Sequence, residues 1–148
     1  MKKCIFAFTV LTCLFSVTAN STNKEAELKP LALEVMQEVK NIAEDARQLR
    51  KSDNPPFSQR ELNLRVIALK EKAAPLGDVY TRPYGRCGAD SLVNSVHGFI
   101  DVMAGSESDT KFWLNMYNIS VADCQYQLDG KDKPHPNVRP VEMDPVQL

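Results

Sequence analysis

The stretch CGADSLVNSVHGFIDVMAGSESDTKFWLNMYNISVADC, residues 87–124, decides the fold because it contains two apolar stripes with helical spacing. Gly105 and the serines after it separate the stripes, a composition typical of a turn. We therefore predict a hairpin of two antiparallel helices, with Ser106 or Ser108 as the N-cap of the second helix. The first stripe comprises Ala89, Leu92, Val93, Val96, Phe99, Ile100 and Met103, and the second comprises Phe112, Trp113, Met116, Tyr117, Val121, Cys124 and Leu128.

The two cysteines of this stretch support the hairpin. Residues that lie level in an antiparallel hairpin are symmetric in number about its turn. The midpoint of positions 87 and 124 falls between Gly105 and Ser106, where composition alone also places the turn. We therefore expect one intramolecular disulfide between Cys87 and Cys124. By the chain-entropy relation, such a bridge stabilises the fold by about 4 kcal/mol.

A long amphipathic helix is predicted before the hairpin. Apolar residues recur every three or four positions from Leu28 to Leu49, with charged side chains between them. Pro30 suits the first turn of such a helix, where its missing N–H group costs nothing. The segment SDNPP, residues 52–56, ends the helix.

A second helix is predicted from its N-terminal signals. Ser58 and Glu61 have the spacing of a capping box, and Phe57 and Leu62 that of a hydrophobic staple. Apolar residues then follow with helical spacing as far as residue 76, and Gly77 ends the helix. Short connections between the four predicted helices favour antiparallel neighbours.

The predicted fold is all-α: a small up-down four-helix bundle with one disulfide. Gly130 marks the end of the last helix. The helical domain spans residues 20–130. Residues 131–148 contain four prolines and are expected to form an extended Pro-rich C-terminal tail.

The first 19 residues have the composition of a secretory signal peptide. Two lysines give a positive start, and residues 4–17 are almost entirely apolar. This apolar run is too short for a permanent membrane anchor. We expect cleavage between Ala19 and Asn20 and a periplasmic protein. The alternative is a lipoprotein acylated at Cys13, although Thr12 stands where such signals usually have glycine, alanine or serine.

Cleavage would leave a mildly acidic chain of single-domain size. The sequence has 18 basic and 19 acidic residues, and loss of the two N-terminal lysines gives a net charge of −3. Nucleic acids and anionic lipids require a clustered basic surface. We therefore expect neither a nucleic-acid partner nor a stable membrane anchor.

The sequence lacks the patterns of common catalytic sites. It contains no GxSxG turn, no phosphate-binding glycine loop and no CxxC pair. A zinc site needs several ligands at recognisable spacing, and the only histidines are His97 and His135. We therefore expect a protein that is not an enzyme and holds no cofactor or metal. The alternative is a helical-bundle carrier of haem, a metal or another ligand, with candidate ligands His97, Met36, Met103 and Met116.

The loop from Asp78 to Arg86 (DVYTRPYGR) is the segment that helix periodicity leaves unexplained. Tyrosine and arginine alternate in it, and these residue types are enriched among the residues that dominate interface energetics. We therefore predict that a protein partner in the periplasm binds through Tyr80, Arg82, Tyr84 and Arg86, with or without the tail. An inhibitor or an immunity protein that neutralises a toxin fits the small size, the single disulfide and the acidic charge.

Overall fold

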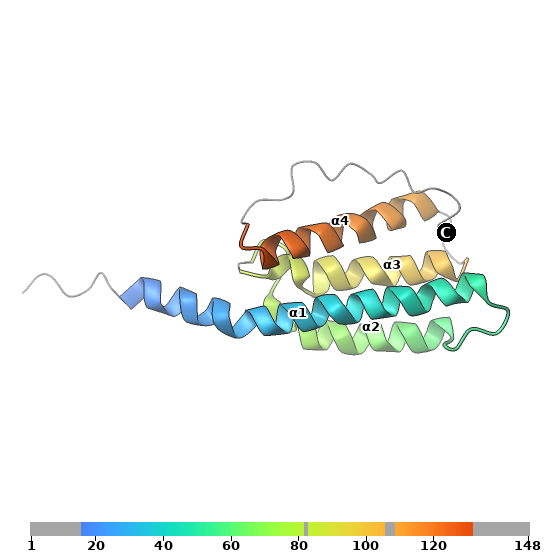
Figure 1. Cartoon of the computed structure of the whole chain (residues 1–148), viewed down its shortest axis with the longest axis horizontal. Coiled ribbons are helices and arrows are strands. Elements are labelled where there is room, and N and C mark those ends of the chain that lie inside the picture. The colour runs from blue at the N-terminus through green and yellow to red at the C-terminus, as the bar shows by residue number, and fades with distance from the viewer. Residues whose placement is uncertain (1–15, 82, 106–108, 132–148) are drawn as a thin grey trace, which may run out of the picture.

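The computed structural model describes residues 16–81, 83–105 and 109–131, with side chains from residue 24 onward in these ranges. These residues form helices and turns, with no strand among them. The four α-helices are α1 (Ser16–Lys51), α2 (Gln59–Ala73), α3 (Asn94–Met103) and α4 (Thr110–Leu128). They run alternately in opposite directions along the long axis (Figure 1), so the predicted four-helix bundle is confirmed.

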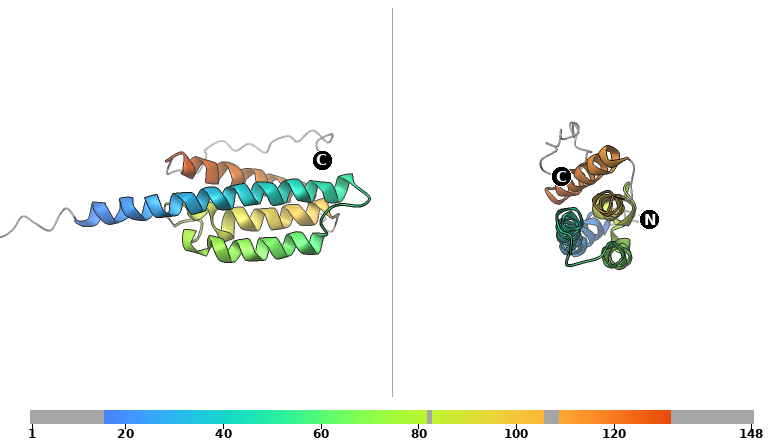
Figure 2. Two further views of the ribbon diagram at one scale, coloured as in Figure 1. Left: turned by 60° about the horizontal axis from the view of Figure 1, so that its bottom comes forward. Right: turned by 90° about the vertical axis from the view of Figure 1, so that its right-hand side faces the viewer.

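α1 and α3 form the centre of the bundle and pack against each other. α1 and α3 each contact both α2 and α4, and α2 and α4 lie at opposite edges of the bundle (Figure 2). The predicted tail lies outside the described residues from position 132 onward. Within the described part of the chain, no helix has the length and apolar character needed to span a membrane.

α1 is longer than its predicted counterpart. It begins at Ser16, so the expectation that Pro30 lies in the first helical turn is wrong: Pro30 is inside the helix. Proline removes the hydrogen bond to the carbonyl of Ala26. Both residues are exposed, so water can bind this carbonyl. The helix also continues through the expected cleavage site after Ala19, and cleavage there stays a prediction.

α2 begins as its sequence predicts. The backbone N–H of Glu61 donates to Oγ of Ser58 at 3.3 Å, and the backbone N–H of Ser58 donates to Oε2 of Glu61 at 2.7 Å. These hydrogen bonds to Ser58 lower the pKa of Glu61. Leu62 is fully buried, and Phe57 is half-buried against the core, so the capping box is confirmed and both staple residues face the core.

α3 and α4 form the predicted hairpin, with one difference at each helix start. Residues Ala89–Val93 form a wider, π-helical turn before α3. The N-cap of α4 is Asp109, whose Oδ1 accepts from the backbone N–H of Phe112 at 3.1 Å. The prediction of a serine cap at Ser106 or Ser108 is therefore wrong, because the N-cap lies one residue after the second serine.

The hairpin is closed at its open end by the predicted disulfide. Cys87 and Cys124 are joined, with their Cα atoms 4.7 Å apart and both side chains fully buried. Gly105 and Gly130 have φ values of 74° and 77° at the ends of α3 and α4. This left-handed conformation favours glycine and confirms both predicted helix ends.

Candidate functional site

The segment from Gly77 to Gly88, here called the Gly77–Gly88 loop, connects α2 to the π-helical turn before α3. It follows a 3₁₀ turn (Ala74–Leu76) and contains another (Gly85–Cys87). The loop is closed tightly on itself. A Cβ atom at Gly85 would lie 1.8 Å from the carbonyl oxygen of Asp78, and one at Gly88 would lie 2.3 Å from that of Gly77. Glycine is therefore required where the two ends of the loop meet.

Local hydrogen bonds fix the first half of the loop. Oδ1 of Asp78 accepts from the backbone N–H of Tyr80 at 2.9 Å and from Oγ1 of Thr81 at 3.0 Å. The backbone N–H of Thr81 donates to the carbonyl of Asp78, and that of Gly85 donates to the carbonyl of Thr81, both at 2.9 Å. The aspartate side chain thus organises the turn that carries Tyr80.

Tyr84 belongs to the hydrophobic core. Its side chain is only 2% exposed, because loop closure turns residue 84 inward at the end of the bundle. Burial raises the pKa of the Tyr84 phenol, and the negative charge of Glu25 on α1 adds to this shift. The interpretation of Tyr84 as part of an exposed partner-binding edge must be corrected, since a partner cannot reach this ring without opening the core.

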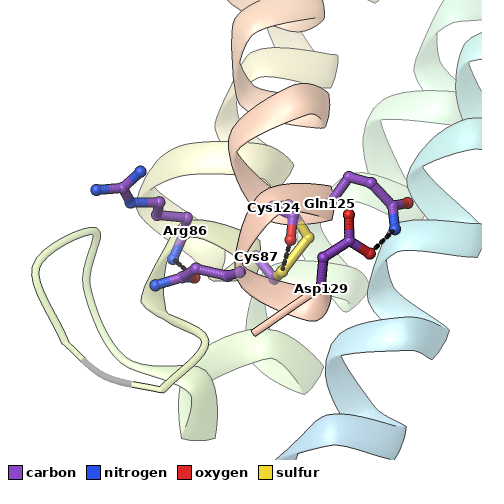
Figure 3. The surroundings of a disulfide bond; sticks show 6 residues. Arg86, Cys87, Cys124, Gln125 and Asp129 are labelled. Carbon is purple, nitrogen blue, oxygen red and sulfur yellow. Dashed lines mark hydrogen bonds between the residues drawn. A yellow bond between two sulfur atoms is a disulfide. The ribbon is translucent and has the colours of Figure 1, made fainter. Parts of the chain in front are cut away.

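Arg86 ties the loop to α4. Its backbone N–H donates to Oε1 of Gln127 at 2.9 Å, and its Nη1 lies 3.7 Å from Oδ1 of Asp123. Figure 3 shows Arg86 beside the disulfide of Cys87 and Cys124, with the guanidinium directed away from the sulfur atoms. The Arg86 side chain is 12% exposed, so it serves mainly to attach the loop.

Tyr80 is the candidate residue that projects from the loop. Its side chain is 92% exposed, the largest exposed fraction among the large apolar and aromatic side chains that the structure describes. Arg82 lies outside the described residues. Of the four predicted contact residues, the structure therefore places Tyr80 on the surface, Tyr84 in the core and Arg86 against α4.

A second polar feature lies between α1 and α2, and sequence analysis missed it. Arg65 of α2 donates to Oδ2 of Asp45 at 2.6 Å and to Oε1 of Glu38 at 2.8 Å, both on α1. Its guanidinium also lies 5.5 Å from the ring centre of Phe57. Partial burial disfavours the charged form of Arg65, but the hydrogen bonds to Asp45 and Glu38 outweigh this effect and raise its pKa.

Two open grooves, of about 360 and 540 Å³, flank Arg65. Ion pairs along the grooves join α1 and α2, since Lys72 of α2 also pairs with Glu34 of α1. Glu44 pairs within α1, with Arg47. The sequence does indicate an acidic face on α1, since Glu38 and Asp45 are two helical turns apart on the same side of the helix. The sequence alone did not show which residue of α2 would face them.

The residues proposed for a carrier are spread over the bundle. Met36 and Met103 are buried in the hydrophobic core, whereas His97 and Met116 are half-buried. Among the described residues, no group of three or more histidine, cysteine, aspartate or glutamate side chains is placed to hold a metal ion. The carrier alternative stays a prediction.

Comparison of the chain with known protein families, with curated proteins and with solved structures gave no match.

Proposed function

We propose that this protein is an exported, non-enzymatic binding protein of the periplasm, of the inhibitor or immunity-protein type. The observation that supports the proposal is the exposed ring of Tyr80 on a loop that is fixed at both ends. The partner is another protein with a surface pocket that accepts a phenol ring and its hydroxyl group.

The physical case depends on preorganisation. A binding loop that is mobile before binding loses conformational entropy when the complex forms. The Gly77–Gly88 loop is held by the turn around Asp78, the buried ring of Tyr84 and the disulfide at Cys87. It can therefore present the backbone of Tyr80 in one conformation, so that little backbone entropy is lost on binding. Tyrosine also combines a large contact area with a polar tip, as interface hot spots usually do.

The test is affinity capture from the native periplasm, followed by measurement of the dissociation constant with the purified partner. We expect Tyr80→Ala to weaken binding at least tenfold, about 1.4 kcal/mol. Phe112→Ala is the matched control, because Phe112 is also an exposed aromatic residue, at 49%, on α4 near the other end of the bundle. This control should bind like the unmodified protein.

The variants used to test binding must not disturb the fold, so Tyr84 is not suitable for substitution. Removing that buried ring would leave a cavity and cost several kcal/mol of stability. Arg82→Ala is the natural second variant, since Arg82 was predicted to contact the partner. Equal affinity of the folded Tyr80→Ala variant and the unmodified protein would refute the proposal.

A further inference from the structure

The outward face of α2 carries four residues in a line: Arg60, Leu64, Ile67 and Glu71, here called the α2 outer stripe. Leu64 and Ile67 are 55% and 56% exposed, although both are large and aliphatic. Arg60 and Glu71 are exposed at either end of the pair. α2 lies at the edge of the bundle opposite α4, so the described helices leave this face uncovered (Figure 2).

The spacing of the stripe is that of a helix–helix seam. Its residues are separated by four, three and four positions, which places them on one side of the helix and matches the spacing of the contact positions in a coiled coil. Two other charged residues of α2 form ion pairs within the bundle: Arg65 and Lys72 pair with acidic residues of α1. Within the described part of the chain, the side chains of Arg60 and Glu71 form no ion pair.

The order of residues in the stripe is self-complementary. Read from either end it has a charge, two aliphatic residues and a charge, but the charge is positive at Arg60 and negative at Glu71. Two copies placed antiparallel therefore bring opposite charges together. In a parallel arrangement each charge would instead face the same charge on the second copy, and like charges at an interface are strongly unfavourable.

We propose that the α2 outer stripe binds the same stripe of a second copy of this chain, antiparallel about a two-fold axis that passes between positions 65 and 66. Leu64 then lies level with Ile67 of the second copy. Arg60 lies level with Glu71 of the second copy, and the symmetry makes each contact twice, as in every two-fold interface. The small side chain of Ala68, also exposed, allows close approach beside the seam.

This interface is small. A stable specific interface generally buries more than about 1,000 Å² in total. The stripe offers two large apolar side chains per copy over about three helical turns. We therefore expect a reversible dimer with a dissociation constant on the order of 10–100 µM.

The deciding experiment is a charge exchange, read by sedimentation equilibrium of the exported protein over a concentration series. Arg60→Glu brings two carboxylates together at each end of the seam, and Glu71→Arg brings two guanidinium groups together. Each variant alone should dimerise at least about tenfold more weakly than the unmodified protein. An equimolar mixture of the two should form a heterodimer, because every charged pair across the seam is then complementary. The double variant Arg60→Glu with Glu71→Arg should also recover dimerisation.

Both substitutions are compatible with the fold. A carboxylate in the first turn of α2 and a guanidinium near its last turn are favoured by the helix dipole, and circular dichroism can confirm the unchanged helix content. Leu64→Asp should abolish the dimer. Leu33→Asp is its control, because Leu33 is 50% exposed on α1 outside the stripe.

The proposal is overturned if the unmodified protein stays monomeric up to about 1 mM, a concentration well above the expected dissociation constant. It is also overturned if Leu33→Asp and Leu64→Asp weaken the dimer equally, or if the mixed charge variants remain monomeric. Occupation of the stripe by a different protein, with no self-association, would likewise contradict it.

Discussion

Replacing Gly98 by alanine tests how closely α3 and α4 pack. A Cβ atom at position 98 would lie 2.1 Å from Cε3 and 2.3 Å from Cδ2 of Trp113. Such overlap forces the two helices or the indole ring to move, and overpacking of this kind costs about 1–3 kcal/mol. Alanine inside a helix otherwise gains about 1 kcal/mol over glycine. We expect the steric cost to exceed this gain, so that Gly98→Ala lowers the free energy of unfolding by up to about 2 kcal/mol.

A double-mutant cycle separates the two effects. Trp113→Ala removes the ring that the new methyl group would meet. In that background, Gly98→Ala should raise the free energy of unfolding by up to about 1 kcal/mol, because the steric clash is gone and the higher helix propensity of alanine is the only remaining effect. The assay is urea denaturation followed by far-ultraviolet circular dichroism, which does not depend on Trp113 fluorescence.

Gly105→Ala is the matched control for this cycle. A Cβ atom at Gly105 meets no atom within 4 Å, but the residue has a φ of +74°. Alanine there should cost about 1 kcal/mol through backbone strain alone, with or without the Trp113 ring. If Gly98→Ala stabilises the protein even with Trp113 present, the close contact between α3 and α4 is refuted.

Three further predictions concern stability. Replacing Cys87 and Cys124 together by alanine should preserve helix content in circular dichroism but lower the free energy of unfolding by about 4 kcal/mol in urea titrations. Burial raises the pKa of Tyr84 and Tyr117, so these phenols lose their protons at a lower pH in the unfolded chain than in the folded protein. The contribution of these two tyrosines to the free energy of unfolding should therefore be constant below about pH 10. Above that pH the free energy of unfolding should fall, less steeply in Tyr84→Phe. Asp109→Ala should cost about 1 kcal/mol by removing the α4 cap, measured by the same titration.

The parts of the fold that the sequence predicted depend on neighbouring residues. Ser58 and Glu61 are three residues apart, and their reciprocal hydrogen bonds form within one helical turn. The register of Cys87 and Cys124 followed from the turn at Gly105, because two straight antiparallel helices fix which residues lie level. Such features require only periodicity, caps and turn residues.

The parts that the sequence did not predict depend on close contacts between distant segments. Gly98 looked like a weak helix residue, and only the position of Trp113 explains it. Tyr84 looked like a loop residue because nothing local shows that the chain reverses at Gly77 and Gly85 and buries the ring. Pro30 suggested a helix start, but a helix exposed to water tolerates a missing internal hydrogen bond.

The two proposed surfaces are geometrically independent, and this independence can be tested. Tyr80 follows the C-terminal end of α2, whereas the proposed two-fold axis crosses α2 near its middle. The loop therefore begins roughly 15–20 Å from the axis along the helix. Because α2 of the second copy runs in the opposite direction, the two Tyr80 residues lie toward opposite ends of the dimer, where each can bind a partner without blocking the other.

We therefore expect Arg60→Glu to leave the affinity of a single partner molecule unchanged while it weakens dimerisation at least about tenfold. Tyr80→Ala should have the opposite effect, with weakened partner binding and unchanged self-association. On a surface coated densely with partner, the dimer should dissociate more slowly than the Arg60→Glu monomer, because two linked sites rebind. Calorimetry in solution and surface binding at two coating densities measure these quantities. A loss of partner affinity in Arg60→Glu as large as that in Tyr80→Ala would show that the α2 outer stripe itself contacts the partner, and the separation of the two surfaces would be wrong.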